Sequence, residues 1–159
     1  MKITLNRKIK FGKIRRIAST LASIELFGVK NLEENIAKIA LEYGMDYKQL
    51  LVLALSIEKL KEKFPKKSSS WIIRAAIRVM AGIYQLSDHV WKVPGLAELN
   101  DHYTWYYVWF DKKESTYKCD CYNHSWGLYR KYRICTHVAA VLVFKEMNRL
   151  MIEYLVEGK

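Results

Sequence analysis

The three cysteines of this chain lie in two short motifs whose side chains can bind a metal ion. Cys119-Asp-Cys121 is followed, after thirteen intervening residues, by Cys135-Thr-His137. Three thiolates and one imidazole form a closed tetrahedral donor set, which is the structural type of zinc site because it leaves no position for water. Soft thiolate ligands also favour zinc over magnesium or calcium. We therefore predict one structural Zn²⁺ ion, held by Cys119, Cys121, Cys135 and His137.

The segments around these motifs predict strands followed by a helix. Residues 102–110 are rich in aromatic side chains that favour strands, and residues 115–121 are expected to form the second strand of a hairpin. Residues two apart on a strand face the same side, so the thiols of Cys119 and Cys121 would converge on one ion. From residue 136 or 137 to about residue 156, apolar residues recur at helical spacing and predict a last helix.

This order of a strand hairpin, Cys-x-Cys, a loop, Cys-x-His and an apolar helix resembles the SWIM-type zinc finger. The resemblance covers roughly residues 90–145, with Trp91-Lys-Val-Pro-Gly95 as the lead-in strand. Cys135-Thr-His137-Val-Ala-Ala140 keeps the alanine of the family pattern Cys-x-His-x-x-Ala. SWIM fingers occur in Mutator-like transposases, SWI/SNF-type ATPases and recombination mediators, so the resemblance implies DNA binding or protein contact. The N-terminal half resembles no family that we identify.

The other three histidines are not expected to bind the metal. His124 is the rival ligand, because it follows Cys121 by three residues, but a lone loop histidine is more often a surface or packing group. His89 and His102 precede the hairpin and have no paired thiol.

Residues 1–88 are expected to form a mostly helical unit, and residues 89–159 the zinc finger with its C-terminal helix. The whole chain is therefore predicted to be an α+β protein. Residues 2–11 alternate between apolar and polar positions, which predicts a leading strand with a basic outer face. Helices are expected over residues 14–24, 32–43, 46–63 and 69–86. A helix-turn-helix is an alternative within residues 40–57, but its second helix is so apolar that we prefer a buried helical hairpin.

Positive charge is concentrated in three parts of the chain. The formal net charge is +11, and the excess lies in residues 1–16, 61–92 and 119–145. Clustered positive charge favours a polyanionic partner, with a solvated basic surface as the alternative. The loop between the ligand pairs interleaves basic and aromatic residues, which suits phosphate contact and base stacking, although its aromatic residues could instead cover the zinc site. The candidate nucleic-acid contacts are Arg130, Lys131, Arg133, Trp126, Lys8, Lys10, Arg15 and Arg16.

These patterns predict a protein that binds nucleic acid, with DNA as the expected partner, and that acts as a small regulator or adaptor in transcription or recombination. The alternative is a protein–protein interaction module that docks on a protein partner through the finger. An enzyme is not expected, because the sequence has no Gly-rich phosphate loop, dinucleotide fingerprint or His-Glu-x-x-His motif. A small-molecule substrate is not expected either.

Two further features of the sequence bear on the expected cellular location of the protein. The longest stretch without Asp, Glu, Lys or Arg is residues 134–144, whereas a membrane-spanning helix needs roughly 20 apolar residues. No membrane partner is therefore expected. Three cysteines cannot all pair, and the first residues do not read as a secretory signal. We expect an intracellular location, cytoplasmic or nucleoid-associated.

Overall fold

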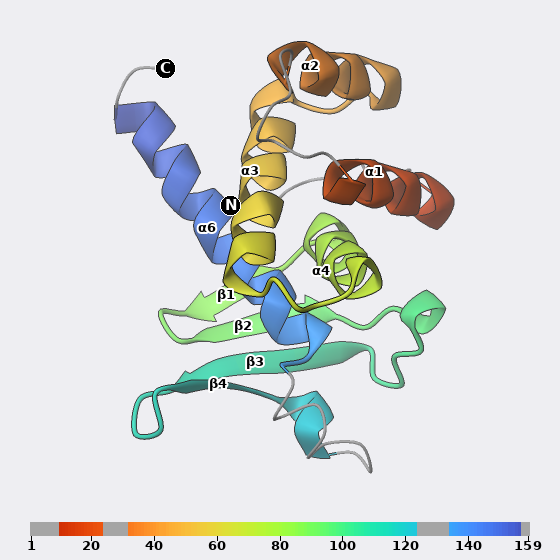
Figure 1. The fold of residues 1–159 in the computed structure, drawn as a ribbon. Helices are drawn as coiled ribbons and strands as arrows, with labels where there is room; N and C mark the ends of the chain where they lie inside the picture. Colours follow the sequence, from red (N-terminus) through yellow and green to blue (C-terminus); the bar gives the residue numbers. More distant parts are fainter. Residues whose placement is uncertain (1–9, 24–31, 124–133, 157–159) are drawn as a thin grey trace.

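A computed structural model gives the fold, and the structure describes residues 10–23, 32–123 and 134–156. These residues form an α+β structure, with helices first, then strands, then a C-terminal helix, as the sequence predicts (Figure 1). The helices are α1 (Phe11–Ser23), α2 (Leu32–Tyr43), α3 (Tyr47–Lys63), α4 (Ser69–Ala81) and α6 (Thr136–Val156). The strands are β1 (Tyr84–Ser87), β2 (Val90–Pro94), β3 (Trp105–Asp111) and β4 (Thr116–Cys119), and two short 3-10 helices are η1 (Ala97–Leu99) and η2 (Asp120–Asn123).

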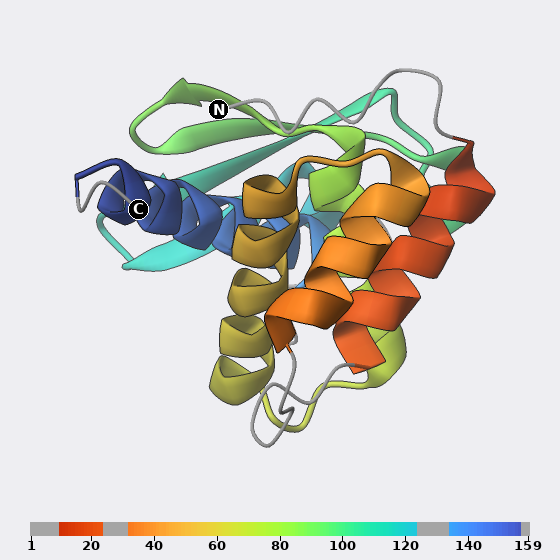
Figure 2. The ribbon, with the colours of Figure 1, turned by 90° about the horizontal axis from the view of Figure 1, so that it is seen from above.

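The α-helices of the described residues are stacked on one face of the sheet (Figure 1). Helix α6 crosses the sheet, contacts β2, β3 and β4, and packs against α3 and α4. Helix α1 packs on α4 and α3, and α2 packs on α3, so both lie in an outer layer farther from the sheet (Figure 2). The two inner helices α4 and α6 therefore connect the strands to the rest of the helical part.

One apolar core joins the helices to the sheet. Trp91 of β2, Tyr106 of β3 and Phe144 of α6 belong to the same buried cluster as Ile17 of α1 and Leu50 of α3. Residues on both sides of the expected boundary at 88/89 thus bury their side chains together.

The starts of two predicted helices are fixed by side-chain caps. Asp46 accepts a hydrogen bond from the backbone N–H of Gln49 at the start of α3, and Ser68 accepts one from Trp71 at the start of α4. Such caps satisfy backbone donors that have no partner within the helix. The helices expected over residues 32–43, 46–63 and 136–156 are confirmed, with α3 beginning one residue later than predicted.

The predicted strand over residues 2–11 is wrong at its C-terminal end. Phe11 is the first residue of α1, and the backbone oxygen of Lys10 already accepts hydrogen bonds from Lys13 and Ile14. Phe11 and Ile14 lie at helical spacing with the fully buried Ile17 and pack against the core. Burial of these residues in a helix therefore outweighs the alternating apolar pattern that predicted a strand. Residues 2–9 lie outside the described residues.

The fourth helix is shorter than the expected 69–86. It ends at Ala81, and Gly82 follows with a φ of 103°, which a residue with a side chain rarely adopts. Tyr84–Ser87 then form β1 and pair with β2. The apolar run through Leu86 is therefore divided between a buried helix and an exposed edge strand.

The strands form one antiparallel sheet in the order β1-β2-β3-β4. The predicted hairpin and its lead-in strand are confirmed as β3, β4 and β2. Strands β3 and β4 are shorter than expected, and β2 begins and ends one residue earlier than the expected lead-in strand. In β2 and β3 buried and more exposed residues alternate, so one face of the sheet lies on the helices. In the described part of the chain, no helix is long and apolar enough to cross a membrane.

Gly95 allows a close backbone approach at the end of β2. Its N–H donates to the Thr104 carbonyl oxygen at 2.7 Å, and a Cβ atom at this position would lie 1.7 Å from the Tyr103 carbonyl oxygen.

We expect Gly95→Ala to lower the free energy of unfolding by about 2–3 kcal/mol, because the backbone must shift. Gly12→Ala is the matched control, since Gly12 is helical and has open space around it. That variant should leave stability unchanged or raise it by up to about 1 kcal/mol in urea unfolding.

Candidate metal centre

Four side chains from three separate places in the fold converge below the helical layer. Cys119 ends β4, Cys121 lies in η2, Cys135 directly precedes α6, and His137 lies in the first turn of α6. All four are buried, and their ligand atoms lie within 4.8 Å of one another. A tetrahedral ion with bonds of about 2.3 Å to sulfur would hold its donors about 3.8 Å apart. A small contraction would thus close the group around one metal ion, and the donor set is compatible with zinc.

The expectation that Cys119 and Cys121 share one strand is wrong. Strand β4 ends at Cys119, and the chain turns into η2, which carries Cys121. The turn brings the Cys121 N–H within 3.5 Å of the Cys119 sulfur. The Val138 N–H lies at the same distance from the Cys135 sulfur. Each of these amides can stabilise a thiolate, so the local backbone favours deprotonated ligands.

The imidazole of His137 is fixed in orientation. Its Nε2 lies 3.2 Å from Oδ1 of Asp101, and its ring stacks on the ring of Tyr106 with centroids 4.1 Å apart. Nδ1 and Nε2 are both buried, and neither makes a hydrogen bond of good geometry in the described structure. A buried nitrogen without a partner is costly unless it binds a ligand. One ring nitrogen can therefore bind a metal, and the 3.2 Å distance between Nε2 and Asp101 favours Nδ1 for that role.

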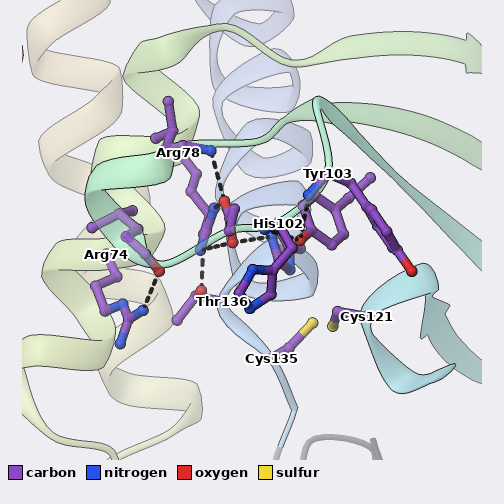
Figure 3. A network of polar contacts seen from close by, with 12 residues as sticks. Arg74, Arg78, His102, Tyr103, Cys121, Cys135 and Thr136 are labelled. Carbon is purple, nitrogen blue, oxygen red and sulfur yellow. Dashed lines mark hydrogen bonds and ion pairs between the residues drawn. The ribbon is translucent and has the colours of Figure 1, made fainter. Parts of the chain in front are cut away.

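Asp101 connects this histidine to α4. Two guanidinium nitrogens of Arg78 donate to its carboxylate at 2.5 and 3.1 Å, and Nε of Arg78 donates to the Thr136 hydroxyl at 2.9 Å (Figure 3). The backbone N–H of Leu96 donates to Oδ2 of Asp101 at 2.8 Å. Burial alone would raise the pKa of Asp101, but the hydrogen bonds from His137 and Arg78 outweigh it and hold that pKa well below its usual range. Asp101 is thus an anion that is fully hydrogen-bonded inside the protein.

Without a metal, burial and the neighbouring side chains set the pKa values of the ligand cysteines. Burial raises the pKa of Cys119, and its neighbours Cys121 and Cys135 raise it further. Burial acts in the same direction on Cys135, but hydrogen bonds from Cys119, Cys121 and His137 outweigh it and lower that pKa. In Figure 3 the sulfur atoms of Cys121 and Cys135 face each other. A bound cation would favour the deprotonated form of all three thiols, because metal binding displaces protons from thiol ligands.

Among the described residues, neither the other expected site residues nor His89 and His102 join the ligand group. Arg15 and Arg16 are exposed on α1, in the outer helical layer, and Lys10 is exposed just before it. His89 packs against Phe110 instead of joining the ligands. The backbone N–H of His102 donates to the Tyr106 hydroxyl. The remaining expected contacts, and the rejected ligand His124, lie outside the described residues; the contacts are Lys8, Trp126, Arg130, Lys131 and Arg133.

Sequence reasoning missed the residues that support the ligands. Asp101, Tyr106, Thr136 and Arg78 are not among the predicted site residues. Arg78 is a positive charge within the mostly apolar helix α4. That charge was the usable signal, because a cation inside a buried helix needs a buried anion as its partner. The sequence does not reveal which acid supplies it.

Comparison of the chain with protein-family models, with curated proteins and with solved structures gave no match. The interpretation of the site therefore rests on its own geometry.

We expect purified protein to contain one zinc ion per chain, measured by elemental analysis. His137→Ala and Cys135→Ser should lose the metal and unfold more easily, because structural zinc supplies an apparent binding free energy on the order of 10–16 kcal/mol in small fingers. His89→Ala is the control, since it removes a histidine outside the ligand group and should keep one zinc. Freshly prepared wild-type protein that contains no metal would contradict this prediction.

Asp101→Asn keeps the shape of the side chain and removes its charge. Only 6% of the Asp101 side chain and 2% of the Arg78 side chain are exposed, so Arg78 would remain buried without a counter-charge. We expect a loss of about 3–5 kcal/mol in unfolding free energy and a zinc affinity lower by roughly 10–100-fold, measured by competition with a chelator. Glu153→Gln breaks an exposed ion pair with Arg149 and should change stability by less than about 1 kcal/mol. An unchanged zinc affinity in Asp101→Asn would show that this carboxylate does not support His137.

Proposed function

We propose that the protein is a zinc-stabilised nucleic-acid-binding protein, with DNA as its partner, that acts as a small regulator or adaptor in transcription or recombination. The observation that carries the proposal is a basic cleft beside the metal centre. The cleft has a volume of about 450 Å³. The helical layer lines it with Lys66, Lys67, Trp71 and Arg74, and the metal-binding segment lines it with residues 134–137.

The positive side of this cleft is the turn between α3 and α4. Residues 63–67 contain three lysines and no acid. Lys63 and Lys66 are exposed, and Lys67 is half-buried. We call Lys63, Lys66, Lys67 and Arg74 the basic corner. Asp101, an acid that lines the cleft, is neutralised by its pair with Arg78.

Aromatic rings support the lysines of the basic corner. The Nζ atom of Lys67 lies 4.9 Å from the ring centre of Trp71, and that of Lys63 lies 5.8 Å from the ring centre of Phe64. The rings of Phe64 and Trp71 meet edge to face with centroids 5.5 Å apart. The ammonium groups are therefore held at the surface, where they can meet phosphate oxygens without first ordering long side chains.

The basic corner is tied directly to the metal-binding segment. Trp71 Nε1 donates to the carbonyl oxygen of Ile134 at 3.0 Å, and Ile134 directly precedes the ligand Cys135. In sequence, Ile134 also directly follows the basic residues Arg130, Lys131 and Arg133. These three lie outside the described residues, and in the proposed function they remain candidate phosphate contacts.

The zinc ion would have a structural task in this function. Bound to Cys119, Cys121, Cys135 and His137, it would fix the two ends of the loop that follows η2. Four protein ligands leave no position for a reactive water, so we do not propose hydrolysis. The chain would bind DNA mainly through Lys and Arg contacts to phosphates, which position a protein on DNA without reading its sequence. This arrangement also agrees with the resemblance to a SWIM finger, which remains part of the proposal.

A protein-docking module is the second candidate, and the free end of α6 favours it. Ile152, Leu155 and Val156 lie at helical spacing, and 61%, 78% and 81% of their surfaces are exposed. An apolar strip of this kind suits a protein partner better than a phosphate backbone. The two candidates differ in salt dependence, because only contacts to phosphates release condensed counterions.

The proposal is tested by measuring duplex DNA affinity against salt concentration. Lys66→Ala/Lys67→Ala should reduce the slope of log affinity against log salt by roughly two units, because each phosphate contact contributes about 0.9. Lys38→Ala/Lys48→Ala is the matched control. Both lysines are exposed, Lys38 on α2 and Lys48 on α3, and the double substitution lowers the net charge by the same amount. The control slope should stay near that of the wild type.

Two outcomes would contradict the proposal. If the wild-type protein binds no nucleic acid at low salt, the docking module becomes the better reading. If both double variants change the slope equally, net charge rather than the basic corner is responsible. Zinc content should be wild-type in both variants, which separates a lost contact from a lost metal.

A further inference from the structure

The sheet has an outer face that the helices of the described residues do not cover (Figure 1). In β3, Tyr106 and Val108 are buried against the helices, while the alternate residues of the strand are half-buried or exposed. Side chains that alternate along a strand point to opposite faces. We call the following residues the outer sheet face: Tyr84, Lys92, Trp105, Tyr107, Trp109 and Lys118.

The register of the strands places these side chains in rows. Lys92 pairs with Tyr84 on one side and with Tyr107 on the other. The Tyr84 and Trp105 rings meet edge to face at 5.8 Å, and the Nζ atom of Lys92 lies 4.0 Å from the ring centre of Trp105. In a neighbouring row, Trp109 pairs with Lys118. The outer sheet face is therefore a continuous surface of aromatic rings with lysines between them.

The charges on this face differ between its centre and its rim. Lys118, at the rim, is bound by Asp111 at 2.8 Å and by Glu114 at 3.1 Å. Lys92, at the centre, forms no ion pair with any described residue, and its ammonium group lies over an aromatic ring. The centre thus combines planar rings with one lysine that forms no ion pair with a described residue, while the Asp120 carboxylate beside it accepts from the backbone N–H of Tyr107 at 3.0 Å. This combination is complementary to a ligand that carries flat groups and negative charge.

We infer that the outer sheet face binds a single strand of nucleic acid by stacking its bases on Trp105, Tyr107 and Trp109, with Lys92 contacting the backbone phosphates. The inference rests on the proposed function and deepens it, because it names unpaired single strands as the substrate class of a second surface. Aromatic rings and cations together form the platform that proteins use for single strands, where stacking tolerates any base sequence.

The spacing of the rings favours unstacked bases over a duplex. Residues two apart on a strand are separated by about 6.8 Å, roughly twice the rise of about 3.4 Å between the bases of one strand in a duplex. Neighbouring rings of β3 would therefore each hold a separate, splayed base. In a duplex the bases are paired and stacked, so their faces are not available to these rings.

The test compares two labelled oligonucleotides of equal length, a 15-nucleotide thymidine strand and an abasic strand with the same phosphates. Fluorescence anisotropy at fixed salt should give tighter binding to the thymidine strand by roughly 5- to 150-fold, the range for stacking of one base. Tyr107→Ala/Trp109→Ala should remove most of this difference and leave affinity for the abasic strand unchanged. Tyr107→Phe/Trp109→Phe keeps the rings and should restore the difference. Leu41→Ala, which removes an exposed apolar side chain from α2, is the surface control and should behave as the wild type.

The outcomes separate this inference from the proposed function. If the wild type binds both strands equally and Lys66→Ala/Lys67→Ala weakens both, the protein binds phosphates but the outer sheet face does not stack bases. If the wild type binds neither strand nor duplex at low salt, the proposed function itself fails. If Tyr107→Ala/Trp109→Ala leaves the difference intact, or instead only changes the oligomeric state in sedimentation, the face is not a nucleic-acid surface. Zinc content and unfolding temperature of each variant exclude a folding defect as the cause.

Discussion

The carboxylate of Asp101 is the point on which the helical layer and the metal centre both depend. It accepts from Arg78 of α4 and from the backbone of Leu96, and it faces Nε2 of His137 at the start of α6. Arg78 in turn reaches Thr136, which lies between two of the metal ligands. A buried charge is tolerated only while all of its partners are present. The position of α4 against α6 and the orientation of the histidine ligand are therefore set by one group, and neither can change independently of the other.

The candidate metal centre joins two short elements at the edge of the sheet to the start of α6. Strand β4 and η2 have four residues each. The ligands that they carry meet those at the start of α6. A bound metal ion would add four ligand bonds between these elements. The single apolar cluster then continues from Cys119, Cys121 and Cys135 into the helical layer without interruption.

The sequence predicts those features that are local in the chain. The helix starts near residues 46 and 69, the period of α6 and the paired ligand spacing each depend on residues that are close in the sequence, and the structure contains these helices and the ligand group. Asp101 could not be predicted, because it lies in a connection without periodicity and meets Arg78 across 23 positions of the chain. The division between α4 and β1 was missed for a related reason. An apolar run suits a buried helix and a strand equally well, and only the backbone at Gly82 separates them.

In the proposed function the metal centre would serve two surfaces at once. On the helical side, the Trp71–Ile134 hydrogen bond connects the basic corner to the segment that carries Cys135. On the side of the sheet, the backbone N–H of Tyr107 donates to Asp120, which lies between Cys119 and Cys121. A contact to phosphates and a contact to bases would thus be held by the same four ligands, one through each half of the ligand set. Loss of the metal would release both connections together, so binding to either surface would depend on the folded, metal-loaded protein rather than on the charge of the chain.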